Sequence, residues 1–484
     1  MQVAAIQRIL GLLLMVFSVS MLPPVLVGLI YGDGAIHPFL LAFGVTLLTG
    51  LTAWLPVRGR RADIRLRDGF VVVVMFWAVL GVFGALPLML AEHPHMAFTD
   101  AVFESISGLT TTGATVLFNI DALPHAILFY RQQLQWLGGM GIVVLAVAIM
   151  PMLGIGGMQL YRAETPGPMK ETKLTPRIAE TAKALWYVYL ALTVACALAY
   201  WVAGMNGFDA IGHAFSTVAI GGFSTHDANM GYYVGQPLVE AVAIVFMLAS
   251  GVNFSLHFLA WRSRRIGHYF ADAELKTYLI VIGSVAAIAV VYLYATGVFE
   301  EPGETVMQGV FQAVSIGTTT GFTTHAYHTW PSFLPVLLLF SSFVGGCAGS
   351  TAGGMKVIRF LLLIKQGRRE VMRVIHPNAV IPIKVGQKTL PNSVIDSVWG
   401  FFAAYVAVFS LFLLVLMFTG EDQITAFSAV AACMNNLGPG LGAVGANYAA
   451  ISDTAKWVLT VAMLLGRLEI FTLLVLLTPA FWRR

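Results

Sequence analysis

The chain of 484 residues is too apolar for a soluble protein. Hydrophobic residues make up 58% of it, charged residues only 11%, and the formal net charge is +4. Its mean hydropathy is +0.80. A soluble core cannot bury this much apolar surface, so the composition excludes soluble enzymes and binding domains and predicts an integral membrane protein.

Ten segments, taken in chain order, are apolar enough to cross a bilayer as helices of about 18 to 26 residues. They lie at residues 9–30, 38–56, 70–91, 134–155, 184–204, 237–261, 276–299, 333–364, 393–419 and 457–479, and the eighth is interrupted by a glycine-rich stretch. Four shorter apolar stretches lie between pairs of spans, at 98–109, 207–218, 305–317 and 422–434. We interpret these four as re-entrant half-helices in an all-α protein, since irregular backbone at membrane depth must be buried in protein or line water.

The distribution of charge predicts the orientation of the spans. Nearly all of the 28 Lys and Arg residues fall on one side, in clusters at 58–67, 162–183, 262–276 and 356–388. The positive-inside rule makes this side cytoplasmic and places both termini there. Only Arg131 and Lys456 lie in outer loops or at the outer starts of helices. Acidic residues gather outside, where they could concentrate cations or belong to ordinary solvated loops, at Asp33, Asp121, Glu300, Glu301, Glu304, Glu421 and Asp422.

Each short stretch leads into a loop, and the four loops align on one glycine. They read Thr111-Thr112-Gly113-Ala114-Thr115, Ile220-Gly221-Gly222-Phe223-Ser224, Thr319-Thr320-Gly321-Phe322-Thr323 and Asn436-Leu437-Gly438-Pro439-Gly440. Six positions before the aligned glycine stand Ser107, Ser216, Ser315 and Ala432. This repetition predicts a helix pair in residues 1–68 followed by four pseudo-symmetric helix–pore loop–helix repeats around a central pore, in residues 69–160, 161–262, 263–390 and 391–484.

The loops have the composition of a cation-selective pore. A dehydrated cation needs oxygen ligands, which a ring of backbone carbonyls can supply, and glycine permits the backbone conformation that this ring requires. A half-helix would also direct its partly negative C-terminal end toward the pore. Candidate ion-binding residues are Thr111, Thr112, Gly113, Ile220, Gly221, Gly222, Thr319, Thr320, Gly321, Asn436, Leu437 and Gly438. Four helix-capping turns in a transporter of another substrate are the alternative.

With these loops, the stretches 345–356 and 465–469 make the sequence resemble the Trk/Ktr/HKT superfamily of potassium transporters, in particular its TrkH/TrkG type of bacterial uptake subunit. The resemblance runs from about residue 70 to the C-terminus, and the extra spans at 9–56 fit the TrkH branch. It implies that the four aligned glycines form a selectivity filter for K⁺, the transported ion. A serine at the first position accompanies sodium permeation in the family, so Gly113 implies potassium selectivity. The fourth loop departs from the pattern because it lacks the threonines of the first and third.

The interruption of the eighth span contains five glycines and no large apolar side chain, so it cannot face lipid as a helix. The resemblance implies an intramembrane gating loop, and the alternative is close helix packing through small residues. Lys356 directly follows the loop and either favours its closed form or is an ordinary cytoplasmic-side cation. The candidate gating residues are Gly345, Gly346, Gly349, Ser350, Gly353, Gly354, Lys356 and Arg467.

Arg467 lies deep in the last predicted span, where a charge usually faces a pore or pairs within the bundle. We hypothesise that it binds carbonyls of the gating loop and forms an electrostatic barrier to cations. Structural pairing, for example with Glu469 across an interface, is the alternative. Asp100, Glu104 and Asp209 lie on the half-helices and are interpreted as structural acids, although Glu104 is deeper than a helix cap. His213, at the equivalent position in the second repeat, is interpreted as a packed core residue.

The resemblance also implies partners and a location. It predicts a homodimer in the bacterial inner membrane whose cytoplasmic face, including the loop 159–183, docks a nucleotide-binding regulatory subunit similar to TrkA. Anionic lipid headgroups would explain the basic inner surface equally well. No nucleotide-binding fingerprint occurs, so we expect no organic cofactor on this chain and no nucleic acid partner.

The predicted function is potassium uptake through a gated, channel-like pore. A symporter that couples potassium to protons or sodium is the alternative, because transporters often bind substrate at broken helices. An integral membrane enzyme is disfavoured, since no His, Asp and Glu constellation has metal-ligand spacing. The channel-like subunit of a potassium-pumping ATPase would share the filter loops but is usually built from more spans.

Overall fold

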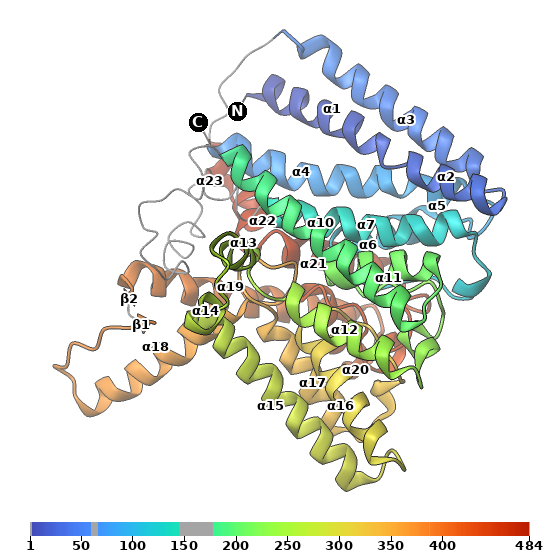
Figure 1. The fold of residues 1–484 in the computed structure, drawn as a ribbon. Coiled ribbons are helices and arrows are strands. Elements are labelled where there is room, and N and C mark those ends of the chain that lie inside the picture. Colours follow the sequence, from blue (N-terminus) through green and yellow to red (C-terminus); the bar gives the residue numbers. More distant parts are fainter. Residues whose placement is uncertain (1, 60–65, 145–177, 387, 484) are drawn as a thin grey trace.

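The computed structural model describes residues 2–59, 66–144, 178–386 and 388–483, and nearly all of its ordered elements are helices (Figure 1). The one strand pair in these ranges is antiparallel and very short, and consists of β1 (Lys384–Val385) and β2 (Lys388–Thr389). Part of the predicted span 134–155 and most of the loop 159–183 lie outside the described residues.

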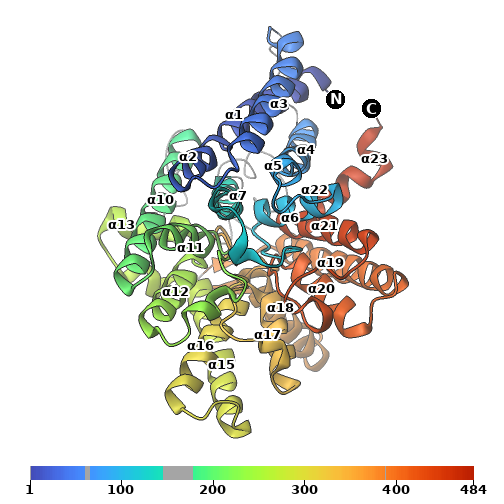
Figure 2. The same ribbon diagram turned by 90° about the vertical axis from the view of Figure 1, so that its right-hand side faces the viewer.

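The N-terminal helices form a layer beside the rest of the bundle (Figures 1 and 2). The helices α1 (Val3–Val19) and α2 (Leu22–Tyr31) make up the first span, and α3 (Ile36–Trp54) packs along α1. A Cβ atom at Gly11 or Gly50 would lie 2.8 Å from the carbonyl oxygen of the other residue. Glycine at both positions therefore lets the two backbones touch, which is a common way to join helices in membranes.

Four units follow, and each has an outer helix, a short half-helix, a loop and an inner helix. The outer helices are α4 (Leu66–Gly84, extended by α5, Leu86–Leu90), α10 (Ile178–Ala203), α15 (Ala273–Thr296) and α19 (Asn392–Phe418). The half-helices are α6 (Phe98–Leu109), α11 (Gly207–Ala219), α16 (Pro302–Gly317) and α20 (Gln423–Met434). All four predicted half-helices are therefore present, and the units follow one another around a common centre in sequence order (Figure 2).

Three of the four half-helices start at a residue that favours a helix start. The side chains of Asn206 and Asp422 accept backbone N–H groups of the first turns of α11 and α20, and Pro302 occupies the first position of α16. These caps satisfy donors that a helix end otherwise leaves unpaired. Most residues of the half-helices are buried, so they form the centre of the molecule, enclosed by the longer helices.

Inner helices are broken in three of the four units. The first, α7 (His125–Val144), is continuous over its described length. In the second unit α12 (Pro237–Ser250) and α13 (Phe254–Ser263) meet at 93°, and in the fourth α21 (Asp453–Arg467) and α22 (Ile470–Leu477) meet at 116°. In the third unit a long loop separates α17 (Phe333–Val344) from α18 (Val357–Ile375).

The breaks affect the count of spans. Within the described residues six helices are long and apolar enough to cross a membrane, or up to eight if each bent pair is one span. The architecture of many apolar helices is confirmed, whereas the number of ten transmembrane helices stays a prediction. The sequence did not predict the breaks near residues 251–253 and 468–469.

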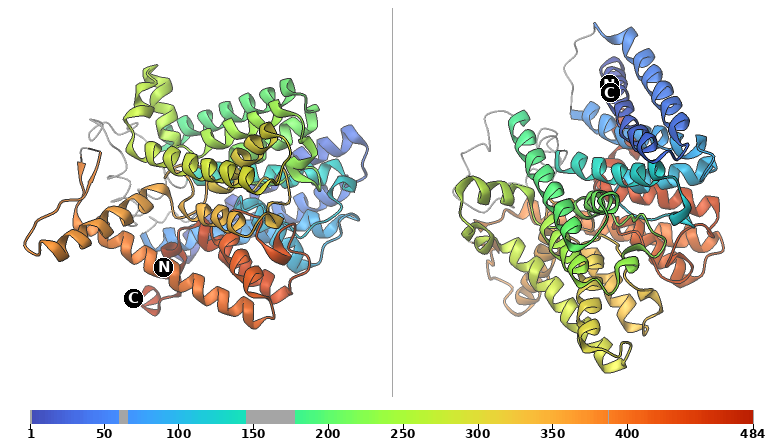
Figure 3. Two further views of the ribbon diagram at one scale, coloured as in Figure 1. Left: turned by 90° about the horizontal axis from the view of Figure 1, so that it is seen from below. Right: turned by 45° about the vertical axis from the view of Figure 1, so that its right-hand side comes forward.

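Both termini lie at one end of the bundle, called the inner end below, together with α14 (Gly267–Ala271), α18 and the β1–β2 hairpin (Figures 1 and 3). A hydrogen bond from Arg67 Nη1 to the Arg483 carbonyl oxygen, 2.9 Å long, joins the start of α4 to the C-terminal end. The helix α18 projects from the bundle at this end (Figure 3). The loops that follow the half-helices open toward the opposite, outer end.

Candidate ion pathway

The loops after the four half-helices share one backbone conformation. The aligned glycines have positive φ angles of 81°, 80°, 78° and 98°, in the order Gly113, Gly222, Gly321 and Gly438. The residue two positions earlier is also left-handed although it carries a side chain, with φ of 53°, 55°, 68° and 51° at Thr111, Ile220, Thr319 and Asn436. Such conformations are uncommon, above all for β-branched residues. Their occurrence in all four loops marks a strained conformation that the surrounding structure maintains.

One backbone hydrogen bond closes each loop onto its half-helix. The N–H group just before the aligned glycine donates to the carbonyl oxygen six positions before that glycine, over 2.8 Å in every repeat. The pairs are Thr112 with Ser107, Gly221 with Ser216, Thr320 with Ser315, and Leu437 with Ala432. Each loop is thereby held at the C-terminal, partly negative end of its half-helix.

The four glycines and their neighbouring carbonyls form a closed ring. A Cβ atom at any of the four glycines would lie within 3.0 Å of a carbonyl oxygen of the next repeat. The contacts run from Gly113 to Gly221, from Gly222 to Thr320, from Gly321 to Leu437, and from Gly438 back to Thr112. Four loops from distant parts of the chain therefore surround one axis, and their close approach leaves no room for a side chain at the aligned position.

A cavity of about 750 Å³ opens above this ring toward the outer end. We call it the vestibule. All four aligned glycines line it, together with parts of the loops that follow them. None of the seven outer acids named from the sequence is among its lining residues, and Asp227 is the acid that does line it. The vestibule thus leads from the outer end to the candidate filter. Its lining carries less negative charge than it would if the seven outer acids surrounded it.

Side chains behind the ring make it unequal from repeat to repeat. Gln135 Nε2 donates to the Gly221 carbonyl oxygen over 2.6 Å, and Tyr448 Oη donates to that of Gly438 over 2.7 Å. Asn436 Nδ2 donates to Thr112 Oγ1 over 2.9 Å. The ring is therefore pseudo-symmetric: its backbone repeats four times, while the side chains that support it differ.

Directly beneath the ring lies the loop between α17 and α18. The Gly353 N–H donates to Thr319 Oγ1 over 2.7 Å, and the Gly354 N–H donates to the Asn435 carbonyl oxygen over 3.0 Å. Thr319 belongs to the loop of the third repeat, and Asn435 directly precedes the loop of the fourth. The loop between α17 and α18 is thus attached to the underside of the candidate filter.

The same loop is tied to the second unit. The Cys347 N–H donates to the Gly251 carbonyl oxygen over 2.9 Å, and Thr351 Oγ1 donates to that of Val218 over 2.9 Å. Left-handed glycines at 345, 349 and 354 shape its path, Gly346 and Ser350 are buried within it, and the stretch is not helical. Close packing of a continuous helix through small residues is therefore not the reason for its composition.

Arg467 reaches this loop from the fourth unit. It is the last residue of α21 and only 6% exposed. Its Nη1 atom donates to the Thr351 carbonyl oxygen over 3.0 Å, and Nη2 donates to that of Gly138 over 3.4 Å. The guanidinium thus connects the loop of the third unit to the inner helix of the first.

The neighbouring charges are arranged around the same loop. Glu469, considered from the sequence as a partner of Arg467, instead pairs with Arg359 at 2.6 Å. The Arg359 guanidinium also lies 4.3 Å from the centre of the Phe401 ring. Lys356 Nζ donates a hydrogen bond to the Ala352 carbonyl oxygen. Lys356 and Arg467 therefore both donate hydrogen bonds to carbonyl groups of the loop. The sequence led to this hypothesis for Arg467 but not for Lys356.

Comparisons with known proteins agree with this arrangement. A family of cation transport proteins, TrkH, matches residues 36–484. This chain belongs to the TrkH family. It is 58% identical to the Trk system potassium uptake protein TrkH of Halomonas elongata and 55% identical to that of Escherichia coli K12, in each case over the full length of both chains. The crystal structure of the potassium transporter TrkH from Vibrio parahaemolyticus superimposes with a TM-score of 0.93 at 55% identity, covering both chains completely.

Membership of the TrkH family makes the chain a multi-pass membrane transporter rather than an enzyme. Among the described residues, no group of three or more His, Cys, Asp and Glu side chains could hold a metal ion. Backbone carbonyl groups of the four glycine loops instead surround the common axis.

Sequence reasoning missed two buried ion pairs in this TrkH-family chain. Arg131 and Lys456 were assigned to the outer loops or helix starts, yet their side chains are only 1% and 5% exposed. Arg131 pairs with Glu104 at 2.9 Å, and Lys456 pairs with Asp100 at 2.7 Å. Both pairs join a half-helix to an inner helix. Their sequence signal was an acid on a half-helix that otherwise consists of small and apolar residues.

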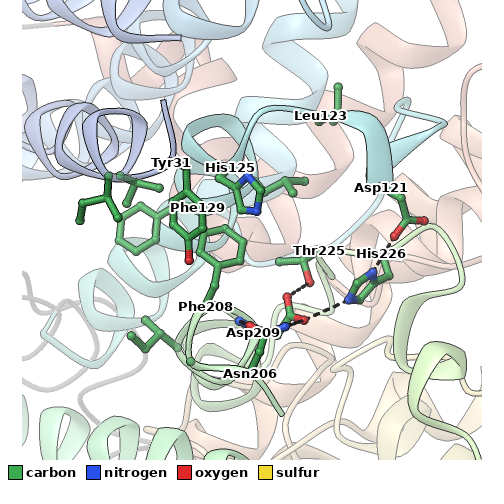
Figure 4. A pocket seen from close by; sticks show the side chains of 15 residues that line it. Tyr31, Asp121, Leu123, His125, Phe129, Asn206, Phe208, Asp209, Thr225 and His226 are labelled. Atoms are coloured by element: carbon green, nitrogen blue, oxygen red, sulfur yellow. Dashed lines mark hydrogen bonds and ion pairs between the residues drawn. The ribbon is translucent and has the colours of Figure 1, made fainter. Parts of the chain in front are cut away.

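A further cavity, of about 630 Å³, lies beside the filter at the outer end, between α2, α7 and α11 (Figure 4). Its wall is aromatic, because the rings of Tyr31 and His125 stack at 4.1 Å and Phe208 packs edge-on against both. At its other side stands the imidazole of His226, which also lines the vestibule. His226 therefore separates the side cavity from the vestibule.

His226 bridges the first and second units (Figure 4). Its Nδ1 atom lies 2.6 Å from Asp121 Oδ1, and Nε2 lies 3.2 Å from Asp209 Oδ2. Tyr232 stacks on the ring at 3.7 Å, and the His213 ring lies 6.4 Å away. Burial favours the neutral ring, but the hydrogen bonds with Asp209 and Asp121 outweigh it and raise the pKa of His226 above its ordinary value.

His213 is itself fully buried, and both ring nitrogens have partners, at the Asp209 carbonyl oxygen and at Ser224 Oγ, each 2.9 Å away. It is a packed residue of the half-helix, as the sequence predicted.

Proposed function

We propose that this chain takes up potassium through a K⁺-selective, gated pore on the axis of the four units. The observation that carries the proposal is the closed ring in which each aligned glycine packs against a carbonyl oxygen of the next repeat. Such a ring can replace the hydration shell of a monovalent cation. The relatives of the chain are named as potassium uptake proteins of the Trk system. The filter would consist of the twelve residues that end at the four glycines.

The loop between α17 and α18 is proposed as the gate. It lies across the underside of the ring and is attached to Thr319 and Asn435, so an ion that leaves the filter would have to displace it. Arg467 supports the closed form through its bond to Thr351, and its charge raises the electrostatic barrier to a cation. Opening would require these bonds to break together.

Control of the gate is proposed to come from the inner end. We assign this end to the cytoplasm, since the exposed Arg368 and Arg373 of α18 lie there with both termini. A homodimer that docks a nucleotide-binding regulatory subunit of the TrkA type on this face would be able to pull α18 and the attached loop. Anionic lipids would contact the same basic residues.

Ion flux into liposomes tests the filter. Purified protein should conduct potassium and rubidium but little sodium or lithium. The substitution Gly113→Ser should lower the preference for potassium over sodium by at least about ten-fold, since it strains a left-handed position and crowds the ring. Gly303→Ser is the control, because a Cβ atom there meets no heavy atom within 4 Å. Equal selectivity of Gly113→Ser and the unchanged protein would contradict this assignment of the filter.

The same liposomes separate a channel from a symporter. A channel gives a reversal potential that follows the potassium gradient alone. A shift of the reversal potential with an imposed pH or sodium gradient would show coupling, and would replace the channel mechanism by potassium symport.

A further inference from the structure

Glu104 lies behind the filter loop of the first repeat and uses both carboxylate oxygens there. It is fully buried in the middle of α6. Thr115 Oγ1 lies 3.0 Å from each of the two oxygens, and the Val116 N–H donates to Oε2 over 3.0 Å. These two residues lie two and three positions after Gly113, where the filter segment of this repeat ends. Glu104 thus fixes the outer end of the first filter loop.

Arg131 connects this carboxylate to the second repeat. Its Nε and Nη2 atoms both lie 2.9 Å from Glu104 Oε1. Its Nη1 atom donates to the Ser224 carbonyl oxygen over 3.2 Å, and its guanidinium carbon lies 4.3 Å from the centre of the Phe223 ring. Phe223 and Ser224 directly follow Gly222. The ion pair is therefore a brace between the outer ends of the first and second filter loops.

The other repeats support their filter loops without such a brace. At the position of Glu104, nine residues before the aligned glycine, they carry His213, Gln312 and Ala429. His213 Nε2 lies 2.9 Å from Ser224 Oγ, and Gln312 Nε2 donates weakly to the Phe322 carbonyl oxygen over 3.4 Å, each within its own repeat. Ala429 offers no polar group. Among the described residues, the ionised support at this position is thus specific to the boundary between the first two repeats.

The ion pair also neutralises a positive charge beside the vestibule. Arg131 lines the vestibule although it is only 1% exposed. An unpaired guanidinium beside the vestibule would repel entering cations. The Glu104 carboxylate cancels this charge and at the same time holds the planar guanidinium in the orientation that reaches Ser224.

We propose that Glu104 and Arg131 are positioning residues for ion selection, which together set the spacing of the first and second filter loops. This inference rests on the proposed selectivity filter and adds the residues that fix its width at one boundary. Neither side chain needs to touch the ion, because each acts through the loop backbone that it holds.

Three variants test the brace by liposome flux of potassium and sodium. Glu104→Gln keeps the shape but loses the charge, and Arg131→Lys keeps the charge but cannot fork between Glu104 and Ser224. Each should lower the preference for potassium over sodium by about ten-fold, as expected for a lost charge-assisted hydrogen bond. The double variant E104Q/R131M leaves no unpaired buried charge. It should recover the thermal stability that single substitutions lose, while its selectivity stays low.

Asp100→Asn is the matched control. Asp100 lies on the same half-helix and pairs with the buried Lys456, but no hydrogen bond joins it to a described residue of the filter loops. This variant should keep the selectivity of the unchanged protein. The proposal is overturned if the folded double variant regains full selectivity, since the pair would then serve stability alone. It is equally overturned if Glu104→Gln and Arg131→Lys fold and select like the unchanged protein. An unchanged protein that does not discriminate potassium from sodium would instead refute the proposed filter itself.

Discussion

Replacement of Gly353 by alanine should open the pore. A Cβ atom at this position would lie within 3.0 Å of the Asn435 carbonyl oxygen, closer than real Cβ atoms approach backbone. Gly353 does not have a positive φ angle, so alanine fits its conformation and only the close approach excludes it. The gating loop would therefore have to move away from the underside of the filter.

Two hydrogen bonds give the size of the effect. The displaced loop loses the bond from Gly353 N–H to Thr319 Oγ1, of 2.7 Å, and the bond from Gly354 N–H to the Asn435 carbonyl oxygen, of 3.0 Å. At a net contribution of about 0.5 to 1.5 kcal/mol each, the closed form is destabilised by about 1 to 3 kcal/mol. The ratio of closed to open protein then falls by about 5- to 150-fold.

The assay is the initial rate of potassium flux into liposomes, without any cytosolic partner. Gly353→Ala should conduct faster than the unchanged protein, because its closed form is destabilised. Gly367→Ala on α18 is the control, since a Cβ atom there meets no heavy atom within 4 Å. An unchanged or slower flux, in a variant that melts and elutes like the unchanged protein, would refute the assignment of this loop as a gate in its closed position.

Two further outcomes follow from charged groups. Arg467→Ala removes the bond to Thr351 and the positive barrier, so potassium flux should rise, and an unaltered flux would contradict the barrier. For His226, the folded protein has a raised pKa, so the bridge to Asp121 and Asp209 is strongest below the ordinary pKa of about 6.5 and weakens as the pH rises through the raised value. The melting temperature of the unchanged protein should therefore exceed that of His226→Gln at acidic pH, and this difference should shrink on the alkaline side. A difference that is constant with pH would show that the bridge does not depend on protonation.

The positions of the half-helices could be predicted from the sequence because their signals are local. A short apolar stretch between two longer ones, followed by a loop with the aligned glycine, is enough to locate each of them. The aligned glycines could be found because four copies of one loop can be compared with each other within a single chain. The structure adds that the four loops meet in one ring, a long-range arrangement for which the sequence offered only the repeat as support.

The breaks in the inner helices could not be predicted from hydropathy. The bend before Phe254 occurs within the three residues Gly251, Val252 and Asn253, and the bend after Arg467 needs only Leu468 and a left-handed Glu469. A window that averages hydropathy over a whole span does not register two or three such residues. The partners of Arg131 could not be predicted for a related reason, because residues 104 and 224 are distant in sequence and only the fold brings them together.

The asymmetry of the pore follows from the space beneath the ring. The filter can be fourfold because each glycine packs against the next repeat in the same way, and four such contacts close around the axis. Beneath it, the loop of the third unit already reaches the second unit at Gly251 and the fourth unit at Asn435. A second loop of this kind would have to occupy the same space beneath the ring. One unit must therefore supply the loop, while the other units supply its partners, among them the guanidinium of Arg467. A gate of this design excludes fourfold symmetry, even though the filter above it favours symmetry.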